Sequence, residues 1–451
     1  MKKEKNKIHF IGIGGIGMSS VARLLNFRGF AVSGSDKKPN LLIKKMQDEG
    51  IKCSIGHSAK NITDCDTVVY SSSIKRNNVE LECARERGLE AIHRAVMLSR
   101  VIGGRKSIAV TGSHGKTTTS AVLALIFEKA GLNPSASIGG EALNFMSNAL
   151  ERKGDYFILE ADESDGSFLR FNPHKAVLLN IDREHLDYFK NMDNAISAYR
   201  RFVQNVKEGG TVYYNADDAR LRRLIKKHSG RCVSFGTMDE ANIKATAIKQ
   251  RGLKIHFRCS IKNKIIPGEF TFPMPGRHNV TNALAAIAVA SEAGIDFNII
   301  KSAMACYKGV KRRFEIKTTS GGITLIEDYA HHPREIKAVL RACKPLRKNL
   351  IVVFQPHRYT RTRDLFKEFI NCFKGAGRVI LTDIYAAGEK TIQGVTSKRL
   401  FAKIKQNGVK NVEYLKKNAI PKRIKSIAGA DDMVLVLGAG DINDIIPKLL
   451  K

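Results

Sequence analysis

The stretch Ile108-Ala-Val-Thr-Gly-Ser-His-Gly-Lys-Thr-Thr-Thr119 decides the fold of the chain around it. Its β-branched start predicts a buried strand over residues 108–111, residues 112–115 form a turn, and the apolar periodicity after Lys116 predicts a helix. A glycine-rich turn between a strand and a helix lets backbone N–H groups approach a polyphosphate, and the helix N-terminus adds partial positive charge. Lys116 would reach the terminal phosphates, and the hydroxyl of Thr117 would hold Mg²⁺.

The spacing G-x-x-G-K-T is two residues shorter than the common phosphate-loop motif, and an ordinary turn followed by a chance Lys-Thr pair is the alternative. We favour the phosphate loop. The residues expected to surround the phosphates are Gly112, Ser113, His114, Gly115, Lys116, Thr117 and Thr118.

Length and charge limit the classes of protein to consider. The chain has 451 residues, and at roughly 100–200 residues per domain this length predicts two or three domains. It carries 76 Lys and Arg against 43 Asp and Glu, a net charge of +33, which would suit nucleic acid, an acidic membrane surface or anionic small substrates. The basic residues are scattered, and no aromatic-interleaved basic stripe or RNA-binding motif is present. The pattern therefore favours anionic substrates and no nucleic-acid partner.

The cysteines and the apolar runs indicate the compartment. The eight cysteines are dispersed without a C-x-x-C pair, which is typical of reduced thiols in a cytosolic protein rather than of a disulfide framework or a zinc site. The start of the chain, residues 1–7, has no apolar run long enough for a signal peptide, and no run approaches the roughly 18 apolar residues of a membrane span. We expect a cytoplasmic protein with no membrane span.

The first hundred residues have the pattern of a dinucleotide-binding domain. A strand over residues 7–11 leads into Gly12-Ile-Gly-Gly-Ile-Gly-Met18 and a helix, and a second strand over 30–33 ends at Gly34-Ser-Asp36. This is the Rossmann fingerprint with an acidic residue in the ribose position. Alone it predicts an NAD-dependent oxidoreductase, but the turn serves any ligand with a pyrophosphate. The expected ligand contacts are Gly12, Gly14, Gly15, Gly17, Met18, Ser35 and Asp36.

Three more residues of this region are candidates for the same site. A strand over 67–70 runs into Ser71-Ser-Ser73, so the hydroxyls of Ser71 and Ser72 would lie at a strand's carboxyl end. Arg94 offers a positive charge, although an ordinary surface arginine explains it equally well. Residues 102–106 are predicted to be the linker to the next domain.

Acidic residues follow the next strands of the central segment. The strand Tyr156-Phe-Ile-Leu-Glu160 runs into Ala-Asp-Glu-Ser-Asp165, and a strand that ends in a carboxylate suits Mg²⁺, which takes one or two carboxylates together with phosphate oxygens. A solvated acidic loop is the alternative. A further strand over 176–180 precedes Ile-Asp-Arg-Glu-His185, where a lone histidine is more often structural than a magnesium ligand.

The central segment ends with two polar stretches. Residues 275–282, Pro-Gly-Arg-His-Asn-Val-Thr-Asn, enter an alanine-rich helix and would contact a base or a phosphate, or simply cap the helix. Residues 308–315 form a basic hinge that closes the domain.

The last part of the chain predicts another α/β unit, with strands at 323–326, 350–354, 379–382 and 433–437. Ligands of open α/β sheets bind at the carboxyl ends of the strands, and polar clusters follow all four strands here. The cluster His357, Arg358, Arg361 and Arg363 places several cations close together, which suits a carboxylate or phosphate ligand.

Six motifs together carry a family resemblance: Gly12-Ile-Gly-Gly-Ile-Gly-Met18, Gly112-Ser-His-Gly-Lys-Thr-Thr-Thr119, Glu160-Ala-Asp-Glu-Ser-Asp165, Gly276-Arg-His-Asn-Val280, Asp328-Tyr-Ala-His-His-Pro333 and Phe354-Gln-Pro-His-Arg-Tyr-Thr-Arg361. In this order they resemble the Mur ligases of peptidoglycan synthesis over nearly the whole chain. The resemblance implies an α/β protein of three domains. These are an N-terminal Rossmann-like domain for a UDP-sugar (1–104), a central P-loop ATPase-type α/β domain (105–312) and a C-terminal Rossmann-like α/β domain for an amino acid (313–451).

The resemblance also implies a reaction: ligation of L-alanine to the lactyl carboxylate of UDP-N-acetylmuramate, with ATP converted to ADP and phosphate. A carboxylate does not react with an amine at neutral pH, so the carboxylate first attacks the γ-phosphate, and the amine then opens the acyl phosphate through a tetrahedral intermediate. Phosphoryl transfer needs positioning and charge neutralisation more than covalent chemistry. The glycine-rich turn of the first domain would accordingly hold a uridine diphosphate rather than NAD. We expect the protein to be a monomer or a homodimer.

By the same resemblance, residue roles follow. Lys116, Glu160, His185, Arg313 and Asp328 would be catalytic. Two magnesium ions are implied, one held by Thr117 and Glu160 and the second by His185, which reverses the structural interpretation of that histidine. Asn279, Arg313 and Asp328 would contact ATP, and His357, Arg358 and Arg361 would receive alanine.

Two departures from related sequences and one further alternative remain. Some Mur ligases carry a carbamylated lysine on the helix after the His-x-Asp motif, but residues 194–206 contain no lysine. We attribute this difference to the alanine-adding branch of the family. The second departure is Glu327, which stands where relatives often have Asp. The recycling ligase that attaches a whole tripeptide to the same sugar nucleotide shares the N-terminal and central motifs, and the stretch 354–361 argues against it. An oxidoreductase would leave Lys116 and Glu160 without a role.

Overall fold

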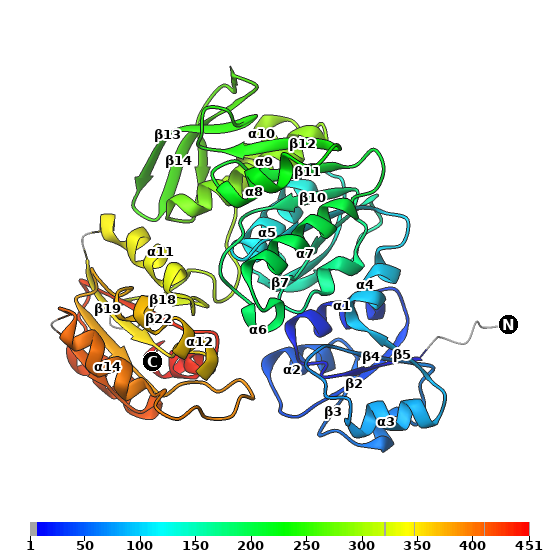
Figure 1. Cartoon of the computed structure of the whole chain (residues 1–451), viewed down its shortest axis with the longest axis horizontal. Helices are drawn as coiled ribbons and strands as arrows, with labels where there is room; N and C mark the ends of the chain where they lie inside the picture. The colour runs from blue at the N-terminus through cyan, green and yellow to red at the C-terminus, as the bar shows by residue number, and fades with distance from the viewer. Residues whose placement is uncertain (1–6, 320–321, 347, 410, 451) are drawn as a thin grey trace. The chain divides into compact units, whose positions relative to one another are not determined.

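The computed structural model describes residues 7–319, 322–346, 348–409 and 411–450, and its strands form three sheets (Figure 1). The prediction that the N-terminus carries no signal peptide concerns the first residues, of which 1–6 lie outside this range. The chain divides into two compact units, described separately below. The first unit comprises Met1–Ala247, Phe257–Phe270 and Thr281–Lys308, and the second comprises Ile248–His256, Thr271–Val280 and Gly309–Lys451.

The first sheet is the predicted Rossmann-like sheet, with all its strands parallel. Its order is β3 (Lys52–Ile55), β2 (Ala31–Asp36), β1 (Lys7–Ile11), β4 (Thr67–Tyr70) and β5 (Glu90–His93). Its helices are α1 (Ile16–Phe27), α2 (Leu41–Asp48), α3 (Val79–Glu86) and α4 (Arg94–Ile102). The strand order reverses at β1, and ligands bind outside the carboxyl ends of strands at such a switch point. The glycine-rich turn that follows β1 therefore lies where a ligand is expected.

The second sheet is larger and carries the phosphate loop. Its order is β15 (Lys264–Ile265), β14 (Lys254–Ile261), β13 (Ile243–Arg251), β12 (Arg231–Gly236), β11 (Thr211–Asn215), β10 (Lys175–Leu178), β6 (Lys106–Thr111), β9 (Tyr156–Glu160), β7 (Ser135–Ala142) and β8 (Ser147–Leu150), and β16 (Phe270–Phe272) pairs with β14. The central strand β6 lies parallel between β10 and β9. The loop after β6, Glu160 at the end of β9 and the segment after β10 thus meet at one edge of the sheet.

The helices of this region are α5 (Lys116–Lys129), α6 (Leu186–Phe189), α7 (Met192–Gln204), α8 (Ala219–Ile225), α9 (Arg277–Glu292) and α10 (Phe297–Ala305). Helix α5 is buried on every side over residues 117–127. A helix that is apolar all round belongs to a core, and α5 packs against β7, β9 and α10. The phosphate loop therefore opens a helix that is anchored in the interior.

The third sheet, in the second unit, is parallel apart from its first edge strand. Its order is β17 (Glu315–Thr318), β18 (Thr324–Asp328), β22 (Asp432–Leu437), β19 (Asn349–Phe354), β20 (Arg378–Leu381) and β21 (Val412–Tyr414). Its helices are α11 (Pro333–Cys343), α12 (Tyr359–Asp364), α13 (Phe366–Ile370), α14 (Ser397–Gln406), α15 (Ile420–Ile427) and α16 (Ile446–Leu450). The four strands predicted here are all present, within two residues of the predicted bounds.

Two predicted boundaries were wrong. The second strand of the first sheet extends to Asp36 instead of ending at residue 33, because residues 33–36 continue the ladder with β3. The predicted linker 102–106 is shorter, because Ile102 ends α4 and Lys106 begins β6.

The structure shows the state of the cysteines and the character of the helices. All eight cysteines are free thiols; Cys306 is exposed and four others are buried. None of the helices within the described ranges has the length and apolar character that crossing a membrane requires.

Candidate active site

The phosphate loop follows β6 and depends on two glycines. Gly112 has φ +136°, and a Cβ there would lie 3.0 Å from the backbone nitrogen of Asn180. Gly115 has φ +89°, and a Cβ there would lie 2.3 Å from the side-chain oxygen of Asn282. Both positions combine a left-handed backbone with a close neighbour, so only glycine fits them without strain. These two glycines therefore limit the conformations that the loop can adopt.

Asn180 and Asp182, from the segment after β10, hold the loop in place. The N–H groups of Ser113 and His114 donate to the backbone and side-chain oxygens of Asn180, at 3.1 and 2.8 Å. The Asn180 amide donates back to the His114 carbonyl at 3.0 Å, and the Ser113 hydroxyl accepts from the N–H of Asp182 at 2.8 Å. The N–H groups of Ser113 and His114 therefore shape the loop. The N–H groups at the start of α5, which have no partner within the helix, remain to face an anion.

Lys116 lies at the centre of this site. Its Nζ donates to the Gly112 carbonyl at 2.7 Å and to Glu163 Oε1 at 3.0 Å. Burial would lower the pKa of Lys116, but the carboxylates of Glu163, Asp162 and Glu160 outweigh burial and raise it. Burial raises the pKa of Glu163 to about 7, although Lys116 opposes the shift. Lys116 is therefore a fixed cation in a nearly dry site.

The three predicted metal-binding residues come from three different elements. Glu160 ends β9 and accepts the N–H of Gly139 at 2.9 Å, and Thr117 is buried in the first turn of α5. His185 has a left-handed backbone, φ 56°, and its Nε2 lies 3.6 Å from Glu163 and 3.7 Å from Glu184. The carboxylate of Glu160 and the hydroxyl of Thr117, beside a phosphate loop, are the oxygen donors that Mg²⁺ prefers, so these two residues fit that ion.

Sequence reasoning did not single out several contributors to this site. Glu163 lies in the acidic stretch three residues after β9, whereas Glu160 is the residue that ends the strand. The sequence shows that Asn180 and Asn282 are polar, but it does not predict that they contact the loop, because these contacts join segments far apart in the chain. Tyr199 of α7 lies in the stretch that lacks a lysine; it is fully buried, and burial raises its pKa well above the ordinary value.

The glycine-rich turn of the first sheet is braced by Asp36 and Asn40. Asp36 accepts the N–H of Gly14 at 3.0 Å, and the Asn40 amide donates to the Gly14 carbonyl at 3.1 Å. Arg94, the first residue of α4, lies against α1, since a Cβ on Gly17 would be only 2.7 Å from its Nη1. The turn, the start of α1 and the Arg94 guanidinium together form a cradle suited to an anion.

The three candidate serines of this region differ in their surroundings. Ser35 is fully buried, and its hydroxyl donates to Glu80 at 2.5 Å, so its side chain serves the interior of the domain. The exposed Ser72 donates to Asp165 of the central region at 2.6 Å. Ser71 is half-buried and accepts the N–H of Ile74 through its carbonyl.

Asn279, Arg313 and Asp328 belong to the second unit. The buried Asn279 donates to the Pro275 carbonyl at 2.8 Å near the start of α9. Asp328 ends β18 and accepts the N–H groups of Phe314 and Ala330, each at 2.7 Å. Burial raises the pKa of Asp328 to about 6, although Arg313 opposes the shift. Arg313 lies over the Tyr329 ring, 5.0 Å from its centroid.

The predicted amino-acid residues gather after β19. The His357 ring stacks on Tyr385 with an interplanar angle of 13°, and its Nδ1 lies 3.2 Å from Nη1 of Arg361. Arg358 has φ 71°, and its N–H donates to the Tyr385 carbonyl at 2.8 Å. Burial, and then the nearby arginines, lower the pKa of His357 to about 3. A neutral imidazole therefore lies beside permanently charged guanidinium groups, an arrangement that suits a small carboxylate.

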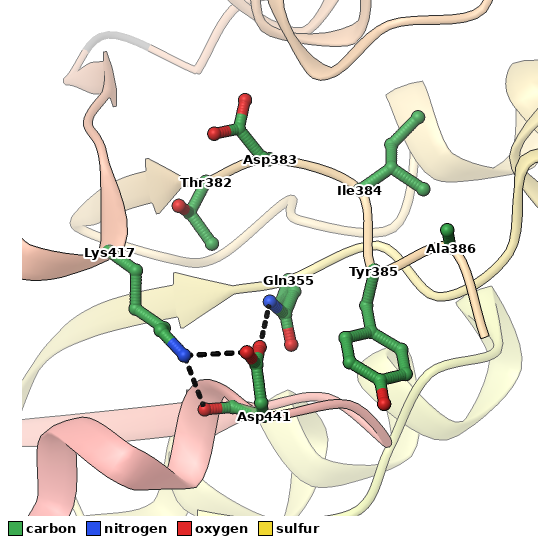
Figure 2. Close-up of a pocket in the computed structure, with 8 residues that line it drawn as sticks. All are labelled: Gln355, Thr382, Asp383, Ile384, Tyr385, Ala386, Lys417 and Asp441. Carbon is green, nitrogen blue, oxygen red and sulfur yellow. Dashed lines mark hydrogen bonds and ion pairs between the residues drawn. The ribbon is translucent and has the colours of Figure 1, made fainter. Parts of the chain in front are cut away.

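A pocket of about 250 Å³ lies at the carboxyl ends of β19, β20 and β22, and its lining residues are drawn in Figure 2. Asp441 accepts from Lys417 Nζ at 2.6 Å and from the Gln355 amide at 2.7 Å, and the Tyr385 ring lines the other side. The sequence indicated polar residues after each of these strands, but not that Tyr385 joins the His357 cluster to this pocket.

Comparison with known proteins assigns these three regions. Residues 7–106 match the Mur ligase family catalytic domain, residues 110–290 match the Mur ligase middle domain, and residues 312–440 match the Mur ligase glutamate ligase domain. All three matches belong to one family, and together they span most of the chain.

Full-length relatives agree with these matches. The UDP-N-acetylmuramate–L-alanine ligase of Geotalea uraniireducens is 41% identical over 447 residues, with 99% of this chain and 97% of the relative covered. The ligase of the same name from Agrobacterium fabrum is 40% identical, with 100% and 98% covered. The crystal structure of the Thermotoga maritima UDP-N-acetylmuramate-alanine ligase is 28% identical, with 98% of both chains covered and a TM-score of 0.84. A murein peptide ligase from Psychrobacter arcticus, 24% identical with a TM-score of 0.73 and 99% and 98% covered, shares the fold.

Proposed function

The chain belongs to the Mur ligase family, and we propose that it joins L-alanine to the lactyl carboxylate of UDP-N-acetylmuramate at the expense of ATP. It is an enzyme of peptidoglycan synthesis, a ligase that releases ADP and phosphate. Relatives of that name align along essentially the whole chain, which supports this reaction over the NAD-dependent oxidation that the first domain alone would suggest.

The observation that carries the nucleotide assignment is the loop from Gly112 to Lys116. Gly112 and Gly115 have left-handed backbones that shape the turn before α5. Lys116, the first residue of α5, donates to Glu163, whose carboxylate lies beside its ammonium group. When ATP binds, the Lys116 ammonium contacts the β- and γ-phosphates. It neutralises the charge that develops as the sugar carboxylate attacks the γ-phosphorus. Asn279, Arg313 and Asp328 complete the contacts to ATP in our proposal.

We assign Thr117, Glu160 and His185 to magnesium, with two ions in the working site. The bound metal supplies charge neutralisation and orientation of the phosphate oxygens. Glu160 contributes a carboxylate at a strand end, and His185 is held in a left-handed backbone that directs its imidazole towards Glu163.

The UDP-sugar is assigned to the first sheet. The turn Gly12–Gly17 with Met18, the start of α1 and Arg94 would hold the diphosphate, and Asp36 keeps the turn in shape through the N–H of Gly14. Ser71 and Ser72 lie at the carboxyl end of β4 and would reach the remainder of the ligand.

Alanine is assigned to the cluster after β19. Arg358 and Arg361 would bind its carboxylate, and His357, neutral at physiological pH because of its lowered pKa, helps to position the Arg361 guanidinium. We retain residues 1–104, 105–312 and 313–451 as the domain boundaries, and place the reaction in the cytoplasm.

The deciding experiment is phosphate release from ATP by the purified protein with UDP-N-acetylmuramate and a panel of L-alanine, L-serine, glycine and the tripeptide. We expect release that requires the sugar nucleotide and is most efficient with L-alanine. Release that is fastest with the tripeptide would assign the chain to the recycling reaction instead. Tight NADH binding without phosphate release would overturn the ligase assignment.

A further inference from the structure

A second pocket lies away from the phosphate loop, between α7 and α8. The two helices pack together in the central region (Figure 1). The pocket has a volume of about 440 Å³ and is lined by Ile196, Arg200, Arg220, Arg223, Leu224, Lys226 and Lys227. Five of these seven residues are permanently cationic at neutral pH, and no acidic residue lines the pocket.

The cations of this pocket lack counter-charges. Some exposed cations elsewhere in the first unit have acidic partners, as in the pairs Lys7–Asp64 at 2.5 Å and Arg100–Glu90 at 2.6 Å. Within the ranges that the structure describes, the side chains of the four pocket cations other than Arg220 form no hydrogen bond or ion pair. Repulsion among unpaired like charges costs free energy, which a bound polyanion would offset.

Helix geometry brings these residues to one place. Ile196 and Arg200 are four residues apart on α7, and Arg220, Leu224 and Lys227 are spaced by four and then three residues on and just after α8, so each set shares a helix face. A favourable helix-end charge would account for cations at the end of α8, but not for Arg200 on the neighbouring helix. The pocket thus combines an apolar part, Ile196 and Leu224, with cations from two elements.

One of the cations is held in place. Arg220 Nη1 donates to the Ile181 carbonyl at 3.2 Å, and the Ile181 N–H donates to Asp218 Oδ2 at 3.1 Å. Asp218 also caps α8 by accepting from the N–H groups of Arg220 and Leu221. A guanidinium fixed in this way loses less entropy when an anion binds.

We propose that this pocket binds a small ligand that carries several phosphate groups and an apolar ring, the chemistry of a nucleoside polyphosphate. The volume is that of a small-molecule site, the cations match the phosphates, and Ile196 with Leu224 would contact the ring. Single-stranded nucleic acid is less suited, because its binding grooves stack bases on aromatic side chains and no aromatic residue lines this pocket.

The position of the pocket connects it to the phosphate loop. Ile181, tied to Arg220 and Asp218, lies between Asn180 and Asp182, the two residues that hold Ser113 and His114. Arg220 therefore joins the pocket directly to the segment that shapes the loop. The pocket itself is independent of the proposed ligation reaction, because its evidence comes only from α7, α8 and their neighbours.

The test is calorimetric titration of tripolyphosphate and of guanosine tetraphosphate into the full chain, with the phosphate loop first saturated by a non-hydrolysable ATP analogue and magnesium. We expect one further site, tighter for the nucleotide than for tripolyphosphate. The double charge reversal Arg223→Glu with Lys227→Glu should weaken this site by about a hundredfold or more, as expected when two phosphate contacts become repulsive. If the ATP analogue itself does not bind, the proposed function fails, and the charge reversal still tests the pocket through tripolyphosphate alone.

The matched control is Lys129→Glu with Lys153→Glu, which reverses the same number of exposed charges in the first unit. We expect this variant to bind both ligands as the parent does. Equal losses in both variants would mean non-specific attraction to a basic surface and would overturn the proposal. The proposal would also be overturned if neither tripolyphosphate nor guanosine tetraphosphate bound in the presence of the ATP analogue. If an RNA oligonucleotide bound instead, and the charge reversal abolished that binding, the pocket would be a nucleic-acid site and the proposal would be wrong.

Discussion

Lys116 Nζ and Glu163 Oε1 lie 3.0 Å apart, inside a site in which Glu163 is only 2% exposed. An isolated charge is costly to bury, and a pair of charges is tolerated only when each has partners. Lys116 meets this condition through Glu163 and the Gly112 carbonyl. The ion pair therefore keeps the lysine charged and in place until a phosphate arrives as its new partner.

Lys116→Ala is expected to lower ADP formation by about a thousandfold or more, because the charge that stabilises the transferring phosphoryl group is lost. Binding of UDP-N-acetylmuramate, measured by calorimetry, should change little, since its proposed site is on the first sheet. Lys129→Ala, at the exposed end of the same helix, is the control and should be fully active. Normal turnover by Lys116→Ala would discard the phosphate-loop assignment.

His185→Ala is expected to raise the Mg²⁺ concentration needed for half-maximal phosphate release by about tenfold or more, the loss typical of a removed contact in a metal site. Chelation of divalent ions should abolish release in the parent, and added Mg²⁺ should restore it. His228→Ala, beyond the end of α8, serves as the comparison. An unchanged Mg²⁺ dependence in His185→Ala would remove this residue from the metal site.

Arg361→Ala is expected to raise the KM for L-alanine by about 10- to 100-fold while leaving the KM for ATP within about twofold, because a charge-assisted hydrogen bond to one substrate is lost. Steady-state phosphate release at varied alanine and varied ATP measures both. Arg363→Ala removes a neighbouring arginine that is paired with Asp364 at the surface, and should leave both constants unchanged. Equal effects of Arg361→Ala on the two substrates would argue against its role.

Asp328→Asn is expected to change how stability depends on pH. The pKa of Asp328 is raised from 3.8 to about 6 in the folded protein, so between these values the folded state keeps a proton that the unfolded state has released. Stability therefore falls as pH rises through this window, by at most about 3 kcal/mol. Because asparagine has no proton to lose, the variant should gain stability relative to the parent from pH 4 to pH 7.

Thermal unfolding at several pH values tests this prediction: the Tm of the variant minus the Tm of the parent should increase from pH 4 to pH 7. The exposed Asp431→Asn removes a surface carboxylate from the same unit and is the control. A Tm gap that stays constant from pH 4 to pH 7 would contradict the raised pKa.

The local structure of the phosphate loop was predictable from the sequence because its signals lie within one short stretch. The β-branched run, the glycines and the apolar periodicity place the strand before Gly112 and the helix from Lys116, as β6 and α5 confirm. Three strands of the first sheet, β1, β2 and β4, and four of the six strands of the third sheet were predictable for the same reason: each of these strands carries its own apolar pattern.

The sequence by itself determined which chemistry each segment can perform: a phosphate loop, a diphosphate turn and a cationic cluster, each from residues close together in the chain. Only the tertiary structure decided the partners. Glu163 rather than Glu160 pairs with Lys116, Asn180 and Asn282 shape the loop, Ser35 faces Glu80, and cations from α7 and α8 share one pocket. These contacts join residues tens of positions apart, and they depend on strand order and helix packing, which no local pattern encodes.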